Sequence, residues 1–379
     1  MMKRASIFSA AVLLMQAAAA WTASAQPAEA PQGAPSLWNI RGTQYPRVLD
    51  DHRVEFRVKA PEAQRVEVEL GQRYPMTRDA EGTWTCITEP QSEGFHYYFL
   101  VVDGVRVADP ASETFYGCST MASGVEIPYD AAKAGRYALR RDVPHGEVHR
   151  CRVYSTVDEA WKTMYVYTPP TYAEGGTFPV LYLQHGGGED ERGWSRQGLA
   201  DVIMDNLIAD GKAVPMVVVM MDGNTRDFTA ELTEVGIPYV ESHFRVRPGQ
   251  EGRALAGLSM GGIQTLNAVV ARPDLVSHAG VFSSGWFRTT ATWMASAYGE
   301  PYYETLRRDA DTYNRNLRTP LWLSMGGPED IAYENCQAMM KRLDECGIRY
   351  TYYEYPGGHT WPVWRESLWQ FAQLIFRPE

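Results

Sequence analysis

Strand-like apolar runs alternate with helix-like runs in the second half of the chain, and this alternation restricts the fold more than any other feature. Residues 178–186, 213–223 and 253–259 are short apolar runs, and helix-like segments follow the first and third of them. Strands that alternate with helices build a parallel sheet that is covered on both faces. We therefore predict a doubly wound α/β domain over residues 148–379, with its functional site at the carboxyl ends of the strands.

In the preceding part of the chain, apolar and polar residues alternate with a different spacing. Residues 37–130 contain short runs of alternating apolar and polar residues, separated by proline, glycine and aspartate. Asp103 and Gly104 lie between two such alternating segments, and an Asp-Gly pair in this position is typical of the turn of a β-hairpin. This pattern predicts a smaller, Ig-like all-β sandwich. Residues 131–147 are polar and are expected to form a linker between the two domains.

The first residues have the features of a processing signal. Two basic residues precede a mostly apolar stretch at residues 5–20, and a small-residue sequence ends at Ala25. The apolar stretch is shorter than the roughly 20 residues that span a bilayer, so it predicts a signal peptide over residues 1–25 and not an anchor. Residues 26–36 are expected to be a flexible leader. The protein is therefore expected to be exported, to a periplasm or to the medium.

Charge and cysteine content exclude several classes of function. The net charge of −10, with only 22% charged residues, argues against a nucleic-acid partner, and 45% hydrophobic residues suit a sizeable core. None of the five cysteines has a cysteine or histidine at the spacing of a metal site, so we expect no metal. Cys336 and Cys346 are expected on one helix about 15 Å apart, too far for a disulfide. We interpret the cysteines mainly as small core residues.

A serine between glycines follows one of the predicted strands. The sequence GLSMG places Ser259 between Gly257 and Gly261, and a helix-like run follows. The motif G-x-S-x-G is weak alone, because a glycine-rich turn can produce it. Between a strand and a helix it is typical of a nucleophile elbow, where glycines allow a sharp turn that exposes the serine hydroxyl. We therefore predict that Ser259 is a nucleophile.

A serine nucleophile requires a base, and the base requires an acid. His359 follows a strand-like run on a glycine-rich loop and is the best candidate base; His185 is better interpreted as shaping a loop. Asp330 follows another predicted strand and is the candidate acid, with Glu329 as its competitor and helix capping as an alternative role. The order serine, aspartate, histidine along the chain is that of α/β-hydrolases.

Two backbone amides complete the predicted site as an oxyanion hole. The Met260 N–H lies at the start of the helix that follows the nucleophile, where negative charge is stabilised. Gly187 lies within three glycines that end the strand of residues 178–186, where an amide can approach a substrate closely. The alternative for these glycines is a flexible turn. The four segments together predict acyl transfer to water by a serine esterase.

The segments YLQHGGGEDERGW, AGLSMGGIQT, GGPED and GGHTWPVWRESLWQF resemble the first carbohydrate esterase family, which includes feruloyl esterases, acetyl xylan esterases and enterochelin-esterase-like proteins. The segments RVEFRVKAPEAQRVEVEL and YYFLVVDGVRVADP are similar to the family-48 carbohydrate-binding sandwich. The resemblance implies an α/β-hydrolase fold, no cofactor, and feruloylated or acetylated xylan or its oligosaccharide esters as partners. It also implies Ser259 as nucleophile, His359 as base, Asp330 as acid, and Met260 and Gly187 as oxyanion donors.

The preferred acyl group is predicted from aromatic residues. Trp286, Tyr298 and Trp361 are candidate substrate contacts and favour a hydroxycinnamoyl ester. An acetyl xylan esterase and a siderophore esterase remain alternatives, and a non-enzymatic glycan-binding protein is the alternative from another class. The front domain offers only Trp38 and Trp84, and Trp84 matches a core position. We therefore expect this domain to support the substrate cleft or form its wall.

Overall fold

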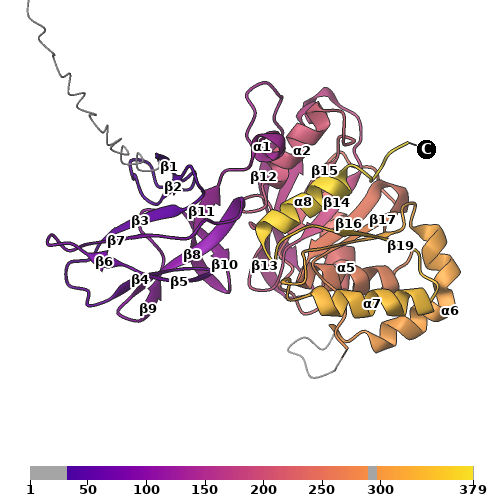
Figure 1. Ribbon diagram of the computed structural model, residues 1–379. Helices are drawn as coiled ribbons and strands as arrows, with labels where there is room; N and C mark the ends of the chain where they lie inside the picture. Colours follow the sequence, from indigo (N-terminus) through magenta and orange to yellow (C-terminus); the bar gives the residue numbers. More distant parts are fainter. Residues whose placement is uncertain (1–31, 289–296, 379) are drawn as a thin grey trace, which may run out of the picture.

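A computed structural model describes the chain over residues 32–288 and 297–378. The predicted signal peptide and most of the leader lie outside these residues. Figure 1 shows an all-β domain beside a larger α/β domain, which confirms the predicted fold class. In the described part of the chain, no helix is long and apolar enough to cross a membrane.

The all-β domain packs two antiparallel sheets face to face. The first has the strand order β1-β2-β3-β7-β6, and the second has the order β10-β11-β8-β4-β5 with β9 paired to β8. The strands are β1 (Gly33–Pro35), β2 (Arg47–Leu49), β3 (Val54–Lys59), β4 (Val66–Leu70), β5 (Gln72–Pro75), β6 (Thr77–Arg78), β7 (Thr83–Ile87), β8 (Gly94–Val102), β9 (Val105–Val107), β10 (Thr114–Gly117) and β11 (Thr120–Ile127). Apolar residues at alternate strand positions fill the core, among them Phe56, Tyr98 and the predicted core residue Trp84.

Two local structures differ from the sequence prediction. Strand β1 pairs with β2, so the last residues of the predicted leader belong to the sheet. The predicted polar linker contains the helix α1 (Ala131–Tyr137), whose first turn is capped by the Asp130 side chain. Tyr137 is buried on this helix and donates a hydrogen bond to Glu366 of the α/β domain. A contact so distant in sequence gives a short helix support that local periodicity cannot reveal.

The α/β domain is built on one sheet with the order β12-β13-β15-β14-β16-β17-β18-β19. Its strands are β12 (Glu147–Ser155), β13 (Ala160–Thr168), β14 (Val180–Gln184), β15 (Val217–Met221), β16 (Arg253–Leu258), β17 (His278–Phe282), β18 (Leu321–Met325) and β19 (Tyr350–Glu354). Strands β12 and β13 pair antiparallel, and β13 pairs antiparallel with β15, whereas every pairing from β15 to β19 is parallel. The carboxyl ends of these parallel strands therefore meet at one edge of the sheet.

Helices cover both faces of this sheet (Figure 1). The helices are α2 (Ala200–Ala209), α3 (Phe228–Ala230), α4 (Ile237–His243), α5 (Met260–Ala271), α6 (Glu300–Asn316), α7 (Tyr333–Glu345) and α8 (Trp361–Ala372), with a π-helical turn over Glu231–Gly236. Leu181 and Leu183 of β14 pack with α2 and α8, whereas Val180 and Tyr182 pack with α5, α6 and α7. Alternate residues of this strand therefore pack into the two apolar cores on opposite faces of the sheet, as expected for a strand buried on both faces.

The two domains share a buried interface. Phe95 and Phe115 of the all-β domain belong to the same apolar cluster as α2 and α8. Arg365 on α8 is 0% exposed and forms an ion pair with Glu126 at the end of β11, with hydrogen bonds of 2.5 and 3.1 Å to the two carboxylate oxygens. A buried arginine requires such a bidentate partner, because an unpaired charge there would be strongly destabilising. This interface joins the sandwich to the helix that follows His359.

Candidate active site

Ser259 occupies a sharp turn between β16 and α5. Its backbone angles, φ 49° and ψ −114°, lie in a region that side-chain-bearing residues rarely adopt. A Cβ on Gly257 would lie 2.5 Å from the backbone of Gly261, and a Cβ on Gly261 would lie 2.7 Å from the carbonyl of His185. The two glycines therefore permit the close packing that this turn requires. The geometry is that of a nucleophile elbow.

His359 and Asp330 lie next to each other on the loops after β19 and β18. The imidazole Nδ1 is 2.8 Å from a carboxylate oxygen of Asp330, which is 3% exposed. Burial by itself would raise the pKa of Asp330, but hydrogen bonds from His359 and from the Ala332 N–H hold this pKa below its ordinary value. Asp330 is therefore an anion, and it accepts a hydrogen bond from the Nδ1–H of His359. The competing Glu329 has an exposed side chain.

Ser259 and His359 line a single cavity of about 330 Å³. Gly186 and Gly187, from the loop after β14, line it as well. Part of its wall comes from the all-β domain, as the sequence had suggested for this domain. The aromatic side chains that line the cavity are Phe95, Tyr97, Trp361 and Trp364. Within the described residues no hydrogen bond joins the Ser259 hydroxyl to the imidazole, and such bonds often form only with substrate present.

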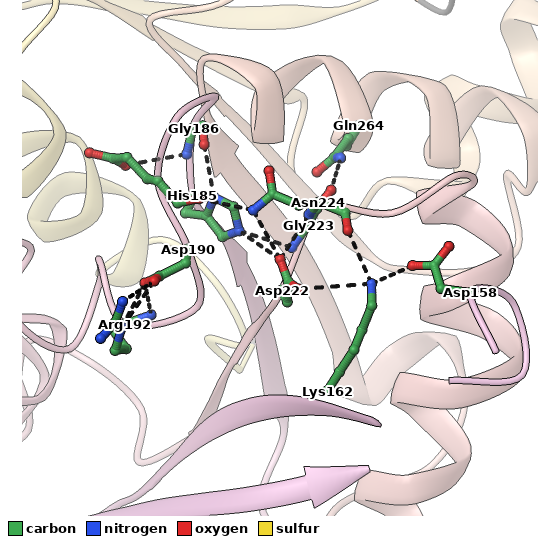
Figure 2. A network of polar contacts seen from close by, with 11 residues as sticks. Asp158, Lys162, His185, Gly186, Asp190, Arg192, Asp222, Gly223, Asn224 and Gln264 are labelled. Carbon is green, nitrogen blue, oxygen red and sulfur yellow. Dashed lines mark hydrogen bonds and ion pairs between the residues drawn. The ribbon is translucent and has the colours of Figure 1, made fainter. Parts of the chain in front are cut away.

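His185 holds the glycine loop in place (Figure 2). Its Nδ1 is 2.8 Å from the Gly186 carbonyl, and its Nε2 accepts a hydrogen bond of 2.9 Å from the Gly223 N–H. Since Nε2 accepts this hydrogen bond, the ring proton lies on Nδ1, which donates to the Gly186 carbonyl. The Asn224 side chain donates to the carbonyl of Glu189 at the other end of the loop. His185 therefore shapes the loop that carries Gly187, as the sequence indicated.

The all-β domain also holds this loop. The tip of the hairpin between β10 and β11 contacts it, where the Ser119 N–H donates a hydrogen bond of 2.9 Å to the Gly188 carbonyl. The Tyr97 hydroxyl donates to Glu189 at 3.0 Å and accepts hydrogen bonds from Trp361 and Gln197. Sequence reasoning missed these residues, since their roles depend on contacts between segments about 70 to 260 positions apart.

Comparison with known proteins identifies the family. A family model described as "Putative esterase" matches residues 159–374, which is more than half of the chain. The chain belongs to this esterase family. The predicted resemblance is thereby confirmed, and the matched region contains all three residues predicted for the triad.

Two relatives are informative. The chain is 39% identical over 367 residues to an endo-1,4-beta-xylanase/feruloyl esterase of Xylanibacter ruminicola, covering 90% of this chain and 47% of that protein. It is 27% identical over 245 residues to an esterase of Mycobacterium tuberculosis, covering 51% of each chain. The chain therefore spans about half the length of these curated relatives.

Solved structures share the fold of this esterase-family chain. A ferulic acid esterase from Anaeromyces mucronatus superposes with a TM-score of 0.55 at 22% identity, covering 64% of this chain and 95% of the other. The enterobactin esterase of Shigella flexneri superposes with a TM-score of 0.65 at 18% identity, covering 85% and 92%. The second match extends over most of the chain, beyond the α/β domain alone.

The three predicted substrate contacts occupy different places in the esterase fold. Trp361 lines the cavity of Ser259. Trp286 is 1% exposed and lies in the core, stacked on Tyr302, so it does not line that cavity. Tyr298 lines a separate cavity next to α7. Of the three aromatic contacts that the sequence predicted, only Trp361 therefore lies at the cavity of Ser259.

Glu189 gives the esterase fold a predicted pH dependence of stability. The carboxyl is 5% exposed, and burial raises its pKa to about 7 from the ordinary 4.5. The folded state therefore keeps a proton that the unfolded state loses above about pH 4.5, so the stability that this group contributes falls as pH rises from about 4.5 to about 7 and is then constant. Between pH 5 and pH 8 wild type should lose about 2 to 3 kcal/mol more unfolding free energy than Glu189→Gln.

Urea unfolding of both proteins at the two pH values measures this difference. Glu329→Gln, which changes an exposed carboxylate, serves as the control and should follow wild type. Equal losses in wild type and Glu189→Gln would contradict the assignment of a protonated acid at this position.

Proposed function

We propose that the chain is a serine carboxylic-ester hydrolase that releases ferulic or a related hydroxycinnamic acid from plant cell-wall xylan. Ser259 is the nucleophile, His359 the base and Asp330 the acid. The single observation that supports this most directly is the His359–Asp330 hydrogen bond at the rim of the cavity that Ser259 also lines. The pairing leaves the imidazole Nε2 free to accept the serine proton.

The reaction follows from these positions. The imidazole takes the Ser259 proton while the hydroxyl oxygen attacks the ester carbonyl, and Asp330 stabilises the imidazolium. The N–H groups of Met260 and Gly187 bind the oxyanion; a first-turn helix N–H such as that of Met260 has no partner within its own helix. The sugar alcohol leaves with the proton from His359, and a water molecule then attacks the acyl-enzyme in the same way to release the acid. These reaction steps require no cofactor.

Two observations favour a hydroxycinnamoyl group over an acetyl group. The cavity volume of about 330 Å³ lies at the lower end of the range for small-molecule sites, which suits one aromatic acyl group and exceeds what an acetyl group needs. Four aromatic residues line the cavity and can pack against a phenolic ring. The relative named as a xylanase/feruloyl esterase supports xylan as the source of the ester.

Three substrates distinguish the candidate functions. We expect methyl ferulate to be hydrolysed with a kcat/KM at least about 100-fold above that of acetylated xylan, because the aromatic ring contributes binding in the cavity. A catecholate trilactone tests the siderophore esterase alternative. The measurement is initial rate against substrate concentration, with release of the acid followed by chromatography. A preference for acetylated xylan or for the trilactone would overturn the proposed acyl specificity.

A further inference from the structure

A polar groove runs along α5 away from Ser259. Its volume is about 830 Å³, and α5 contributes Met260, Gln264, Asn267 and Ala271 to its lining. From the first to the last of these residues the helix rises about 16 Å. The loop after β15 and the segment Phe228–Ala230 line the groove as well. Ser259 lines the apolar cavity and the next residue, Met260, lines this groove, so both spaces border the elbow.

Polar side chains in the groove have unused hydrogen-bonding capacity. Gln264 is 9% exposed, and its side-chain nitrogen donates a hydrogen bond of 2.7 Å to the Gly223 carbonyl (Figure 2). Its side-chain oxygen is buried without a hydrogen-bond partner, and so is the Thr225 hydroxyl oxygen. Buried polar atoms of this kind are costly unless a ligand or water completes their hydrogen bonds. Both residues line the groove and add to its polar lining, which suits a ligand rich in hydroxyl groups.

The groove also has an aromatic surface. The Tyr302 ring lines it and is half-buried. Trp286 stacks behind this ring, with centroids 4.9 Å apart and an angle of 3° between the planes. The Trp286 indole donates a hydrogen bond to Asn267, another groove residue, so the pair is fixed in orientation. A flat aromatic face beside hydrogen-bonding groups suits a sugar ring, which has an apolar face and a hydroxylated edge.

We propose that this groove binds the carbohydrate part of the ester, a linear chain of neutral sugar residues, while the apolar cavity binds the acyl group. The inference rests on the proposed function, and it assigns the sugar chain to the groove along α5. An ester bond held at Ser259 joins an aromatic acid to a polyhydroxylated alcohol. The two flanking spaces differ in the same way, because aromatic side chains line one and mostly polar side chains line the other.

Two variants test the proposal with two substrates, methyl ferulate and a feruloylated arabinoxylo-oligosaccharide. Tyr302→Leu removes the flat ring but still covers Trp286, and Ala271→Trp places a bulky side chain at an exposed position in the groove. We expect kcat/KM for the oligosaccharide to fall about tenfold in each variant, mainly through KM. Hydrolysis of methyl ferulate should remain within about twofold of wild type, since this substrate has no sugar to place.

Control variants separate the proposal from the proposed function. Tyr302→Phe keeps the ring and should behave as wild type, as should Tyr154→Leu at an exposed position on β12. Equal losses on both substrates would overturn the inference, because Tyr302 would then act through the fold. Unchanged oligosaccharide hydrolysis in both groove variants would overturn it as well, while leaving the esterase activity in place. A wild-type protein that hydrolyses neither substrate would contradict the proposed function itself.

Discussion

Replacing Ser259 with alanine is expected to lower kcat about a millionfold and to leave KM nearly unchanged. In the proposed mechanism the hydroxyl oxygen of Ser259 forms the acyl-enzyme, and alanine has no atom that can do so. Loss of the nucleophile of a serine triad has an effect on this scale because the remaining residues act only through it. Hydrolysis of methyl ferulate at saturating substrate measures the change.

Ser242→Ala provides the matched control, because this serine is exposed on α4, away from the cavity. It should retain wild-type kcat. A fluorophosphonate probe should label wild type and Ser242→Ala but not Ser259→Ala. A Ser259→Ala protein that keeps even a tenth of wild-type kcat would refute the assignment of the nucleophile.

Replacing Asp330 with asparagine is expected to lower kcat about 10,000-fold. In the proposed mechanism the carboxylate accepts a hydrogen bond from the Nδ1–H of His359, so the imidazole presents an unprotonated Nε2 to the serine. An asparagine can instead donate to Nδ1, which favours the opposite tautomer and leaves Nε2 protonated. The pKa of Asp330 is lowered in the folded protein, so wild type should lose no activity through this group near neutral pH.

Glu329→Gln is the control for the acid, because the two carboxylates are adjacent in sequence but differ in burial. Its kcat should stay within a few-fold of wild type. If Glu329→Gln lost the larger part of activity and Asp330→Asn did not, the acid of the triad would be Glu329. Circular dichroism of both variants should match wild type, because each change preserves side-chain volume.

The sequence predicts the α/β sheet and the placement of the candidate site well, because both depend on local patterns. Alternating strand-like and helix-like runs specify a parallel sheet, and Ser259, Asp330 and His359 each follow a strand of that sheet. The structure places these loops at one edge and brings His359 against Asp330.

Contacts across long sequence distances could not be predicted in the same way. Tyr97 is an ordinary strand residue in the sequence, and only the folded interface places its hydroxyl next to Glu189 and Trp361. Packing between distant segments likewise decides which aromatic residues face the core. Trp286 therefore lies behind Tyr302 instead of touching the cavity, and α1 forms in a segment whose composition is that of a linker.

The hairpin between β10 and β11 has an evolutionary consequence. Its Ser119 N–H and the nearby Tyr97 hydroxyl hold the two residues that follow Gly187, so the all-β domain supports part of the glycine segment of the α/β domain. Recombination that exchanged the sandwich for an unrelated module would separate the loop from its scaffold. In this chain such an exchange would therefore remove two hydrogen bonds that hold the glycine segment, and the new module would have to replace them.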